Sequence, residues 1–180
     1  MSIEKNISDE ALVELIRTRD KELFTELIKR YESRLVRYAS YLIHDNDRAE
    51  DAVQEAFIKA YINLNVFDLN KKFSSWIYRI VHNEVVNAVK KHHLEVPLAE
   101  DIDFEGKENI EEDYSRDEII KKVNQCLGKM PMHYAEPVSL YYLEQKSYEE
   151  ISAILRIPMG TVATRINRAK KILKNLCRTD

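Results

Sequence analysis

Residues 159–178 contain six basic side chains and no acidic one, which favours contact with a polyanion. Apolar residues recur at helical spacing and predict the buried stripe of a helix: Val162, Ile166, Ala169, Leu173 and Leu176. The polar and cationic residues predicted to face outward from this helix are Thr161, Thr164, Arg165, Arg168 and Lys171. Short polar side chains in a first helical turn can contact base edges, and the cations beyond them can neutralise phosphates. We therefore expect this helix to enter the major groove of DNA.

A second short helix is predicted just before it, so that the two form a helix-turn-helix motif. Ser147 and Glu150 have the spacing of a capping box, in which each side chain satisfies a backbone N–H at the start of a helix. Pro158 cannot continue that helix, so a turn is expected over residues 156–160. The alternative is a basic helix that closes an ordinary bundle. The capped partner helix and the turn favour the DNA-binding interpretation.

A second cationic surface is predicted upstream, on a helix over about residues 73–91. Its inward positions are expected to be Ile77, Ile80, Val81 and Ala88, and the residues expected to project from it are Lys72, Trp76, Arg79, Asn83 and Lys90. Cations can hold a nucleic-acid backbone, an asparagine can pair with a base edge, and an aromatic ring can stack on an unpaired base. The preceding loop adds Asn65 and Phe67 as candidates. The alternative is that Trp76 and Phe67 are core aromatics.

The helix predicted over residues 47–64 has an unusual outer face. Its inward positions are predicted to be Ala49, Val53, Ala56, Phe57, Ala60 and Leu64. The opposite side combines acidic, amide and apolar side chains: Asp51, Gln54, Glu55, Ile58 and Ile62. Such a mixture suits a partner protein with a basic, partly apolar surface, but single exposed isoleucines are also common.

All of these periodic segments are helical, and the chain has only 3 glycines among its 180 residues, so an all-α fold is expected. Further helices are predicted over residues 9–17 and from about residue 20 to residue 42. Asp47 and Glu50 are predicted to cap the third helix.

In the C-terminal part, Ser115 and Glu118 are predicted to cap a helix that stops near Gly128. Pro131 suits the first turn of the next helix. Pro137 either kinks that helix or marks its beginning, a choice that the sequence leaves open.

Charge divides the chain into three parts. Residues 1–92 hold fifteen basic and fifteen acidic side chains, residues 93–114 one and nine, and residues 115–180 twelve and seven. The net charges are therefore 0, −8 and +5. We expect two helical domains, residues 1–92 and 115–180, joined by an acidic linker.

Several classes of protein are disfavoured. No apolar run is long enough to span a bilayer and no signal peptide is evident, so a cytoplasmic protein without membrane insertion is expected. Cys126 and Cys177 lack metal or redox spacing and are expected to be ordinary thiols. No cluster predicts a metal or cofactor, and no constellation predicts catalytic residues. The chain is therefore not expected to be an enzyme.

Three ordered segments resemble the sigma factors of bacterial RNA polymerase, in particular the small extracytoplasmic-function class. They are AEDAVQEAFIKAY (Ala49–Tyr61), FSSWIYRIVHNEVVNAVKK (Phe73–Lys91) and SYEEISAILRIPMGTVATRINRAKK (Ser147–Lys171). The resemblance implies a transcription initiation subunit with a region-two-like domain, residues 1–92, and a region-four-like domain, residues 115–180. The latter is expected to be a winged-helix-like four-helix unit without a wing.

The resemblance also implies roles for the candidate residues. Asp51, Gln54, Glu55, Ile58 and Ile62 would bind the clamp helices of the largest subunit of core RNA polymerase, and a further contact with the flap region is expected. The residues that would recognise and help to open the minus-ten promoter element are Lys72, Trp76, Arg79, Asn83, Lys90, Asn65 and Phe67. Those that would bind the minus-thirty-five element are Thr161, Thr164, Arg165, Arg168 and Lys171. An anti-sigma factor is an expected partner.

The acidic linker has two open interpretations, entry into the polymerase active-site channel or a solvated tether. Two residues depart from the family pattern. Arg156 occupies a turn position that is often glycine, at a cost of about 1 kcal/mol if it is left-handed, and Ala163 replaces a frequently basic residue. A free-standing repressor or activator and a nucleic-acid enzyme are the competing interpretations, but neither a dimerising helix nor a catalytic cluster is predicted.

Overall fold

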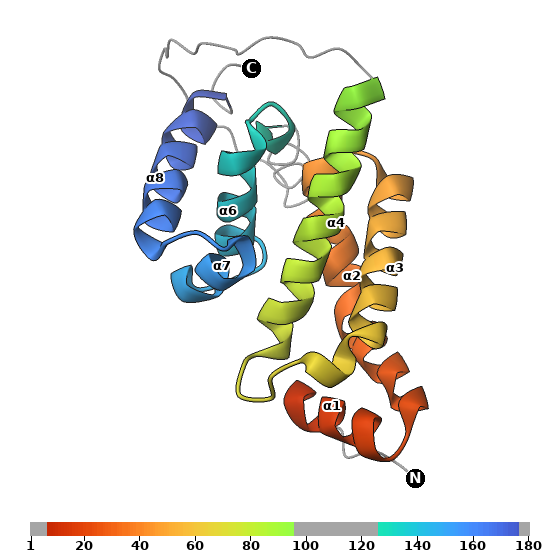
Figure 1. The fold of residues 1–180 in the computed structure, drawn as a ribbon. Coiled ribbons are helices and arrows are strands. Elements are labelled where there is room, and N and C mark those ends of the chain that lie inside the picture. Colours follow the sequence, from red (N-terminus) through yellow and green to blue (C-terminus); the bar gives the residue numbers. More distant parts are fainter. Residues whose placement is uncertain (1–6, 96–125, 177–180) are drawn as a thin grey trace, which may run out of the picture. The chain divides into compact units, whose positions relative to one another are not determined.

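The structure, a computed structural model, describes residues 7–95 and 126–176. Within these ranges every regular element is a helix (Figure 1). The chain forms two compact units that divide near residue 90, the first carrying α1 to α3 and most of α4, the second carrying α6, α8 and most of α7. The all-α, two-domain fold predicted from the sequence is confirmed. The predicted linker lies mostly outside the described residues, so the domain boundaries stay a prediction.

The N-terminal unit begins with α1 (Asp9–Thr18), the short 3₁₀ helix η1 (Lys21–Leu23) and α2 (Phe24–Ile43). Side-chain caps mark the starts: Ser8 Oγ accepts from the N–H of Ala11 at 3.2 Å, and Asp20 Oδ1 accepts from that of Glu22 at 2.9 Å. These caps satisfy N–H groups that have no partner inside a helix.

The unit continues with α3 (Asn46–Ile62), the 3₁₀ helix η2 (Leu64–Val66) and α4 (Phe73–Glu95). The predicted cap of α3 by Asp47 is wrong, because Asp45 is the N-cap and its Oδ1 accepts from the N–H of Arg48 at 3.1 Å. The shift arises because His44 ends α2 in a left-handed conformation, which leaves Asp45 as the first extended residue before α3.

The core of the N-terminal unit is built around the small-residue face of α3. The buried residues of this helix are Ala49, Ala52, Val53, Ala56, Phe57 and Ala60, as predicted apart from the addition of Ala52. The ring of Phe24, on α2, packs against Phe57 and Tyr61 at centroid distances of 6.4 and 5.1 Å. Small side chains allow the backbones of α2 and α3 to approach closely, so this face is committed to the interior.

Helix α4 packs against both α2 and α3. Tyr38 on α2 and Tyr78 on α4 have ring centroids 5.3 Å apart, and Arg48 Nη2 on α3 donates to the carbonyl of Ala88 at 2.9 Å. The residues of α4 that are buried are Phe73, Ile77, Tyr78, Val81 and Val85. The predicted burial of Ile80 and Ala88 is wrong, since both are partly exposed. The buried face of α4 includes the aromatic residues Phe73 and Tyr78, which the aliphatic pattern left out.

The described part of the C-terminal unit contains α6 (Met132–Tyr142), α7 (Tyr148–Leu155) and α8 (Met159–Leu176). Pro131 is the N-cap of α6 rather than a residue of its first turn, and Pro137 lies inside the helix. The helix predicted from Ser115 to Gly128 lies outside the described residues except for its last positions, 126–128, which are helical.

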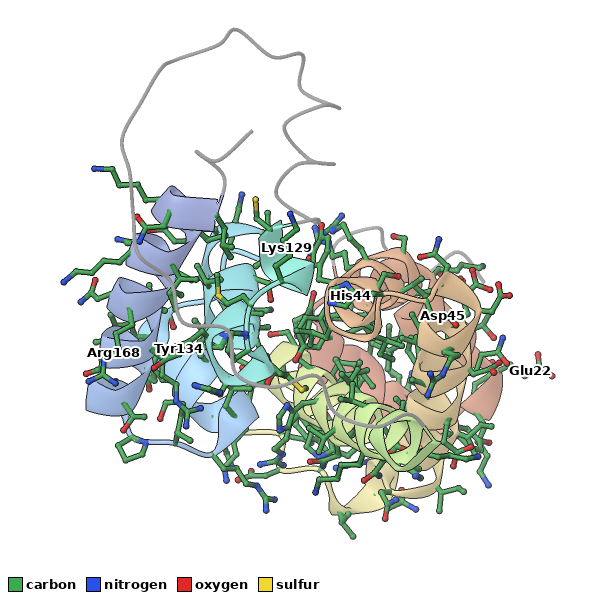
Figure 2. All side chains as sticks on the ribbon, turned by 90° about the horizontal axis from the view of Figure 1, so that it is seen from above. Glu22, His44, Asp45, Lys129, Tyr134 and Arg168 are labelled. Carbon is green, nitrogen blue, oxygen red and sulfur yellow. The ribbon has the colours of Figure 1, made fainter. Side chains whose placement is uncertain are left out.

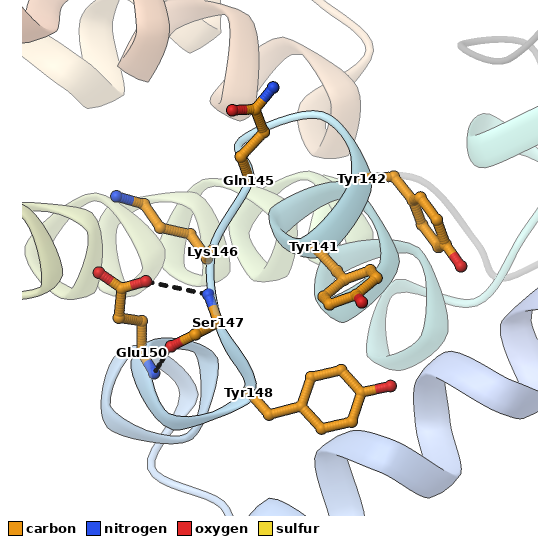
Figure 3. Close-up of a pocket in the computed structure, with 7 residues that line it drawn as sticks. All are labelled: Tyr141, Tyr142, Gln145, Lys146, Ser147, Tyr148 and Glu150. Carbon is orange, nitrogen blue, oxygen red and sulfur yellow. Dashed lines mark hydrogen bonds between the residues drawn. The ribbon is translucent and has the colours of Figure 1, made fainter.

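The predicted capping box of α7 is confirmed. Ser147 Oγ accepts from the N–H of Glu150 at 3.1 Å, and Glu150 Oε2 accepts from the N–H of Ser147 at 2.9 Å (Figure 3). Arg156 ends α7 with φ 54° and ψ 43°, the left-handed conformation considered for it. The predicted stripe of α8 is confirmed in its first part, where Val162, Ile166 and Ala169 are fully buried. The predicted burial of Leu173 and Leu176 is wrong, since both are partly exposed near the end of the helix.

The observed state of Cys126 differs from the free thiol that was expected. It is 5% exposed and forms a disulfide bond, so the expectation of an ordinary thiol is wrong for this residue. Sequence spacing marks only compact C-x-x-C sites, so it gave no indication of the state of Cys126.

We expect Arg156→Gly to raise the free energy of unfolding of the C-terminal unit by about 0.5–1 kcal/mol, because glycine adopts the left-handed conformation without a Cβ penalty. Arg156→Ala keeps the Cβ and should give no such gain. Urea unfolding followed by circular dichroism measures both variants. Equal stability of the glycine and alanine variants would show that the turn is not strained.

Candidate nucleic-acid and partner surfaces

One face of α3 is exposed along its whole length. We call it the α3 ridge, and it consists of Asp51, Gln54, Glu55, Ile58 and Ile62, all of which are exposed. Ile58 is 54% and Ile62 70% exposed, so the predicted outward stripe is confirmed as a surface. Because the opposite face of α3 packs in the core, neither isoleucine can be covered by rotation of the helix. The ridge combines apolar area with carboxylates, as a protein interface does.

Lys59 connects the margin of the α3 ridge to α4. Its Nζ lies 3.4 Å from Glu55 Oε1 and 2.8 Å from Glu84 Oε2. The hydrogen bond with Glu84 is the largest cause of a raised pKa for Lys59, so the ammonium stays charged near neutral pH. This interaction ties the two helices together next to the ridge.

A second surface lies on and before α4. We call it the α4 surface, and it consists of Asn65, Lys72, Trp76, Arg79, Asn83 and Lys90. Asn65, Lys72, Asn83 and Lys90 are exposed, whereas Trp76 and Arg79 are partly exposed. These side chains offer cations, amides and one accessible indole edge, which are the groups that hold a strand and contact its bases.

Phe67 does not belong to this surface in the structure. It is 4% exposed, and its ring centroid lies 5.1 Å from that of Trp76 and 5.7 Å from that of Phe73. Trp76 also packs against Phe73 at 5.7 Å. Phe67 therefore occupies the core position that was the alternative interpretation, and its ring supports the indole of Trp76 from beneath.

A third surface lies between the first turn of α6 and the first turns of α8. This α8 groove has a volume of about 380 Å³ and is lined by His133, Tyr134, Gly160, Thr161, Thr164, Arg165 and Arg168. Figure 2 labels Tyr134 on α6 and Arg168 on α8. Four of the five residues predicted on α8 meet here, and Lys171, the fifth, is exposed further along the helix. Cationic and hydroxyl groups in one groove can hold a phosphate chain beside base edges.

His133 and Tyr134 form the α6 wall of the α8 groove, and the sequence did not identify them. They belong to a helix outside the helix-turn-helix motif, so no spacing signal marked them. The pKa of His133 is lowered, first by burial and then by the charge of Arg165. A lowered pKa favours the neutral imidazole, which can donate or accept a hydrogen bond in the groove.

The C-terminal unit also has an aromatic pocket that sequence reasoning missed. Tyr141 and Tyr142 at the end of α6 and Tyr148 at the start of α7 line it (Figure 3). The turn between these helices contains Gln145 in a left-handed conformation, φ 53°, which brings the rings together. Lys170 Nζ lies 5.5 Å from the centroid of Tyr142, so this cation is held against a ring.

Within the described residues, no three or more His, Cys, Asp and Glu side chains gather where they could hold a metal ion. Nor does any helix in these ranges have the length and apolar character needed to cross a bilayer.

Two family models match the chain. The one described as Sigma-70 region 2 matches residues 27–94, and the one described as Sigma-70, region 4 matches residues 120–173. The first range contains the α3 ridge and the α4 surface, and the second contains the α8 groove. Together the two matches cover more than half of the chain.

Two similar proteins are also described as sigma factors of RNA polymerase. The chain is 30% identical over 179 residues to the ECF RNA polymerase sigma factor SigW of Bacillus subtilis, a match that covers 92% of this chain and 95% of that protein. It is 34% identical over 176 residues to the RNA polymerase sigma-H factor of Pseudomonas aeruginosa, covering 92% and 91%.

Solved structures share the fold. CnrH in complex with the cytosolic domain of CnrY gives a TM-score of 0.74 at 23% identity, covering 96% of this chain and 98% of that one. The sigma factor RpoE in complex with the anti-sigma factor NepR from Bartonella quintana gives 0.69 at 23% identity, covering 87% and 98%. At this identity the likeness concerns the fold alone.

We expect Arg165→Gln to raise the pKa of His133, because it removes a cation that disfavours the imidazolium. The pKa should still lie below its usual value, since burial is the larger cause. An NMR titration of the His133 ring protons measures the change. Arg168→Gln, which lines the same groove but is not among the causes of the shift, is the control, and equal shifts in both variants would contradict the geometry.

Proposed function

The chain belongs to the sigma-70 family as an ECF sigma factor of RNA polymerase, a transcription initiation factor, and we propose that its three surfaces divide the work of initiation. The α3 ridge binds core polymerase, the α4 surface binds the minus-ten element, and the α8 groove binds the minus-thirty-five element. The observation that carries the proposal is the α3 ridge, in which two isoleucines stay exposed among carboxylates on a helix whose other face is buried.

The α3 ridge suits the clamp helices of the largest polymerase subunit. Full burial of an isoleucine side chain contributes about 1.5–3 kcal/mol, and Ile58 and Ile62 have most of that area available. Asp51 and Glu55 add negative charge, which steers association with a basic partner. We also propose a second contact, between the C-terminal unit and the flap region of the polymerase. No residues are assigned to this contact.

The α4 surface has the groups needed at an opened minus-ten element. Lys72, Arg79 and Lys90 can hold the phosphate backbone, and Asn83 can pair with a base edge. The partly exposed ring of Trp76, supported by Phe67, can stack on an unpaired base. In this arrangement Phe67 acts through Trp76 rather than by direct contact.

The α8 groove supplies the minus-thirty-five contacts. Thr161 and Thr164 lie where the recognition helix would meet base edges, while Arg165, Arg168 and Lys171 can neutralise phosphates. We add His133 and Tyr134 as contacts to the same backbone, because they form the opposite wall of the groove.

Regulation and location follow from the same proposal. RpoE from Bartonella quintana was solved with an anti-sigma factor, which supports an anti-sigma partner for this chain as well. We place the protein in the cytoplasm, where core polymerase acts.

A mobility-shift assay tests the proposal as a whole. Promoter fragments recovered by in vitro transcription from a genomic pool are mixed with the chain alone, with core polymerase alone, or with both. We expect a heparin-resistant complex and transcripts only with both. Tight dimeric binding by the chain alone would instead support a free-standing repressor or activator.

We expect the double variant Ile58→Ala, Ile62→Ala to weaken core binding by about tenfold or more, because it removes most of the exposed apolar area of the α3 ridge. A pull-down with core polymerase at graded concentrations measures the loss. Val66→Ala is the matched control, since Val66 is 79% exposed but lies on η2, outside the ridge. Unchanged core affinity of the double variant would exclude the ridge as the docking surface.

We expect Arg168→Ala to weaken binding of holoenzyme to minus-thirty-five DNA by about tenfold and to lower the salt dependence by roughly one phosphate contact. Filter binding over a range of salt concentrations measures both quantities. Lys174→Ala, at an exposed position near the end of the same helix, is the control. If both variants lose the same affinity, only the overall charge of α8 matters and the assignment of Arg168 fails.

A further inference from the structure

The segment between α3 and α4 is attached at both ends to α1. From these attachments we infer that Arg17 and Glu10 are positioning residues, which hold this connecting loop (residues 63–72) so that Asn65 and Val66 face the opened minus-ten strand. The inference rests on the proposed role of the α4 surface. It adds α1, a helix to which no function was assigned, to the recognition of the promoter.

Arg17 secures the first part of the connecting loop. Its Nε donates to the carbonyl of Leu64 at 3.0 Å, and its Nη2 donates to the carbonyls of Leu64 and Phe67. The planar guanidinium presents its donors in a fixed fork, so two carbonyls bound by one side chain are held in a set orientation. Leu64 is the first residue of η2 and Phe67 follows its last, so the two bonds hold this short helix at both ends.

Glu10 secures the other end. Its Oε1 accepts from the backbone N–H of Phe73 at 2.9 Å, and Phe73 is the first residue of α4. A carboxylate at this point satisfies an N–H that has no partner within the helix. Its negative charge also interacts favourably with the positive end of the helix dipole. Glu10 and Arg17 are seven residues apart, two helical turns, so they project from one side of α1.

The two attachments decide what the loop presents. Between the carbonyls that Arg17 holds, Asn65 and Val66 are exposed, and Val66 is 79% exposed. Phe67, the next residue, turns inward onto Trp76. The middle of the loop is closed by its own turn, in which Asp68 Oδ1 accepts from the backbone N–H and the Nδ2 of Asn70, each at 3.0 Å. An amide and an apolar side chain are thereby held exposed directly before Phe67, whose ring packs on the indole of Trp76.

The same hydrogen bonds would be present if Arg17 and Glu10 only stabilised the fold. The test therefore needs a measurement that a change in stability alone does not alter. Holoenzyme is assembled from the full chain and core polymerase and is mixed with a pool of single-stranded DNA containing six randomised positions. The bound fraction is sequenced, and the enrichment of each base at each position gives the sequence preference of the protein. Core affinity, thermal melting and binding to minus-thirty-five duplex are measured in parallel.

We expect Arg17→Gln to lower the enrichment of the preferred base by about tenfold, the factor that corresponds to 1.4 kcal/mol, at the position where Asn65→Ala also lowers it. Core affinity and minus-thirty-five binding should stay within about twofold. Arg17→Lys should recover part of the preference, because an ammonium can still donate to a carbonyl but lacks the fork. Glu10→Gln should give a smaller loss in the same direction. Arg19→Gln, an equal loss of charge at an exposed neighbouring position, is the control.

Three results would overturn the inference. A normal preference in Arg17→Gln, while Asn65→Ala loses it, would reject the role of α1 and leave the proposed function intact. A parallel fall in melting temperature, core affinity and minus-thirty-five binding would make Arg17 a structural residue only. The absence of any sequence preference in the unaltered chain would reject the proposed function itself, and the inference with it.

Discussion

The packing of α3 on α2 through small side chains is the constraint on which the N-terminal unit depends. Four alanines on one face of α3 are buried, and substitution by anything larger would separate the two helices. This contact fixes the rotation of α3 about its axis. The acidic and isoleucine side chains of the ridge then have no interior to enter, so their exposure is a consequence of the core and not a local irregularity.

Helix ends carry much of the remaining organisation. The starts of four elements are capped by Ser8, Asp20, Asp45 and Ser147. From α1, Glu10 binds the first N–H of α4 and Arg17 binds carbonyls at η2. Each bond is modest, about 1 kcal/mol for a typical cap. Together they fix where helices stop and in which direction the chain continues, which is what a recognition surface assembled from several helices requires.

The sequence was sufficient wherever the signal is local. Periodicity identified the first three buried positions of α8 and nearly all of the buried face of α3, and the spacing of Ser147 and Glu150 identified the start of α7. For Arg156 the family pattern, in which this turn position is often glycine, raised the left-handed conformation only as a condition, and the structure has it. Local signals were less reliable at boundaries, because the cap of α3 depends on how α2 ends, and the sequence pattern alone favoured Asp47 over Asp45.

The order of the motifs, the helical class and the three candidate surfaces were therefore set by residue type and spacing alone. Only the tertiary structure decided that Phe67 lies beneath Trp76 and that His133 and Tyr134 line the α8 groove. It also decided that α1 holds the loop before α4 and that Cys126 is disulfide-bonded. These features join residues that are distant in the chain, and periodicity describes the face of one helix but not the neighbour that this face will meet.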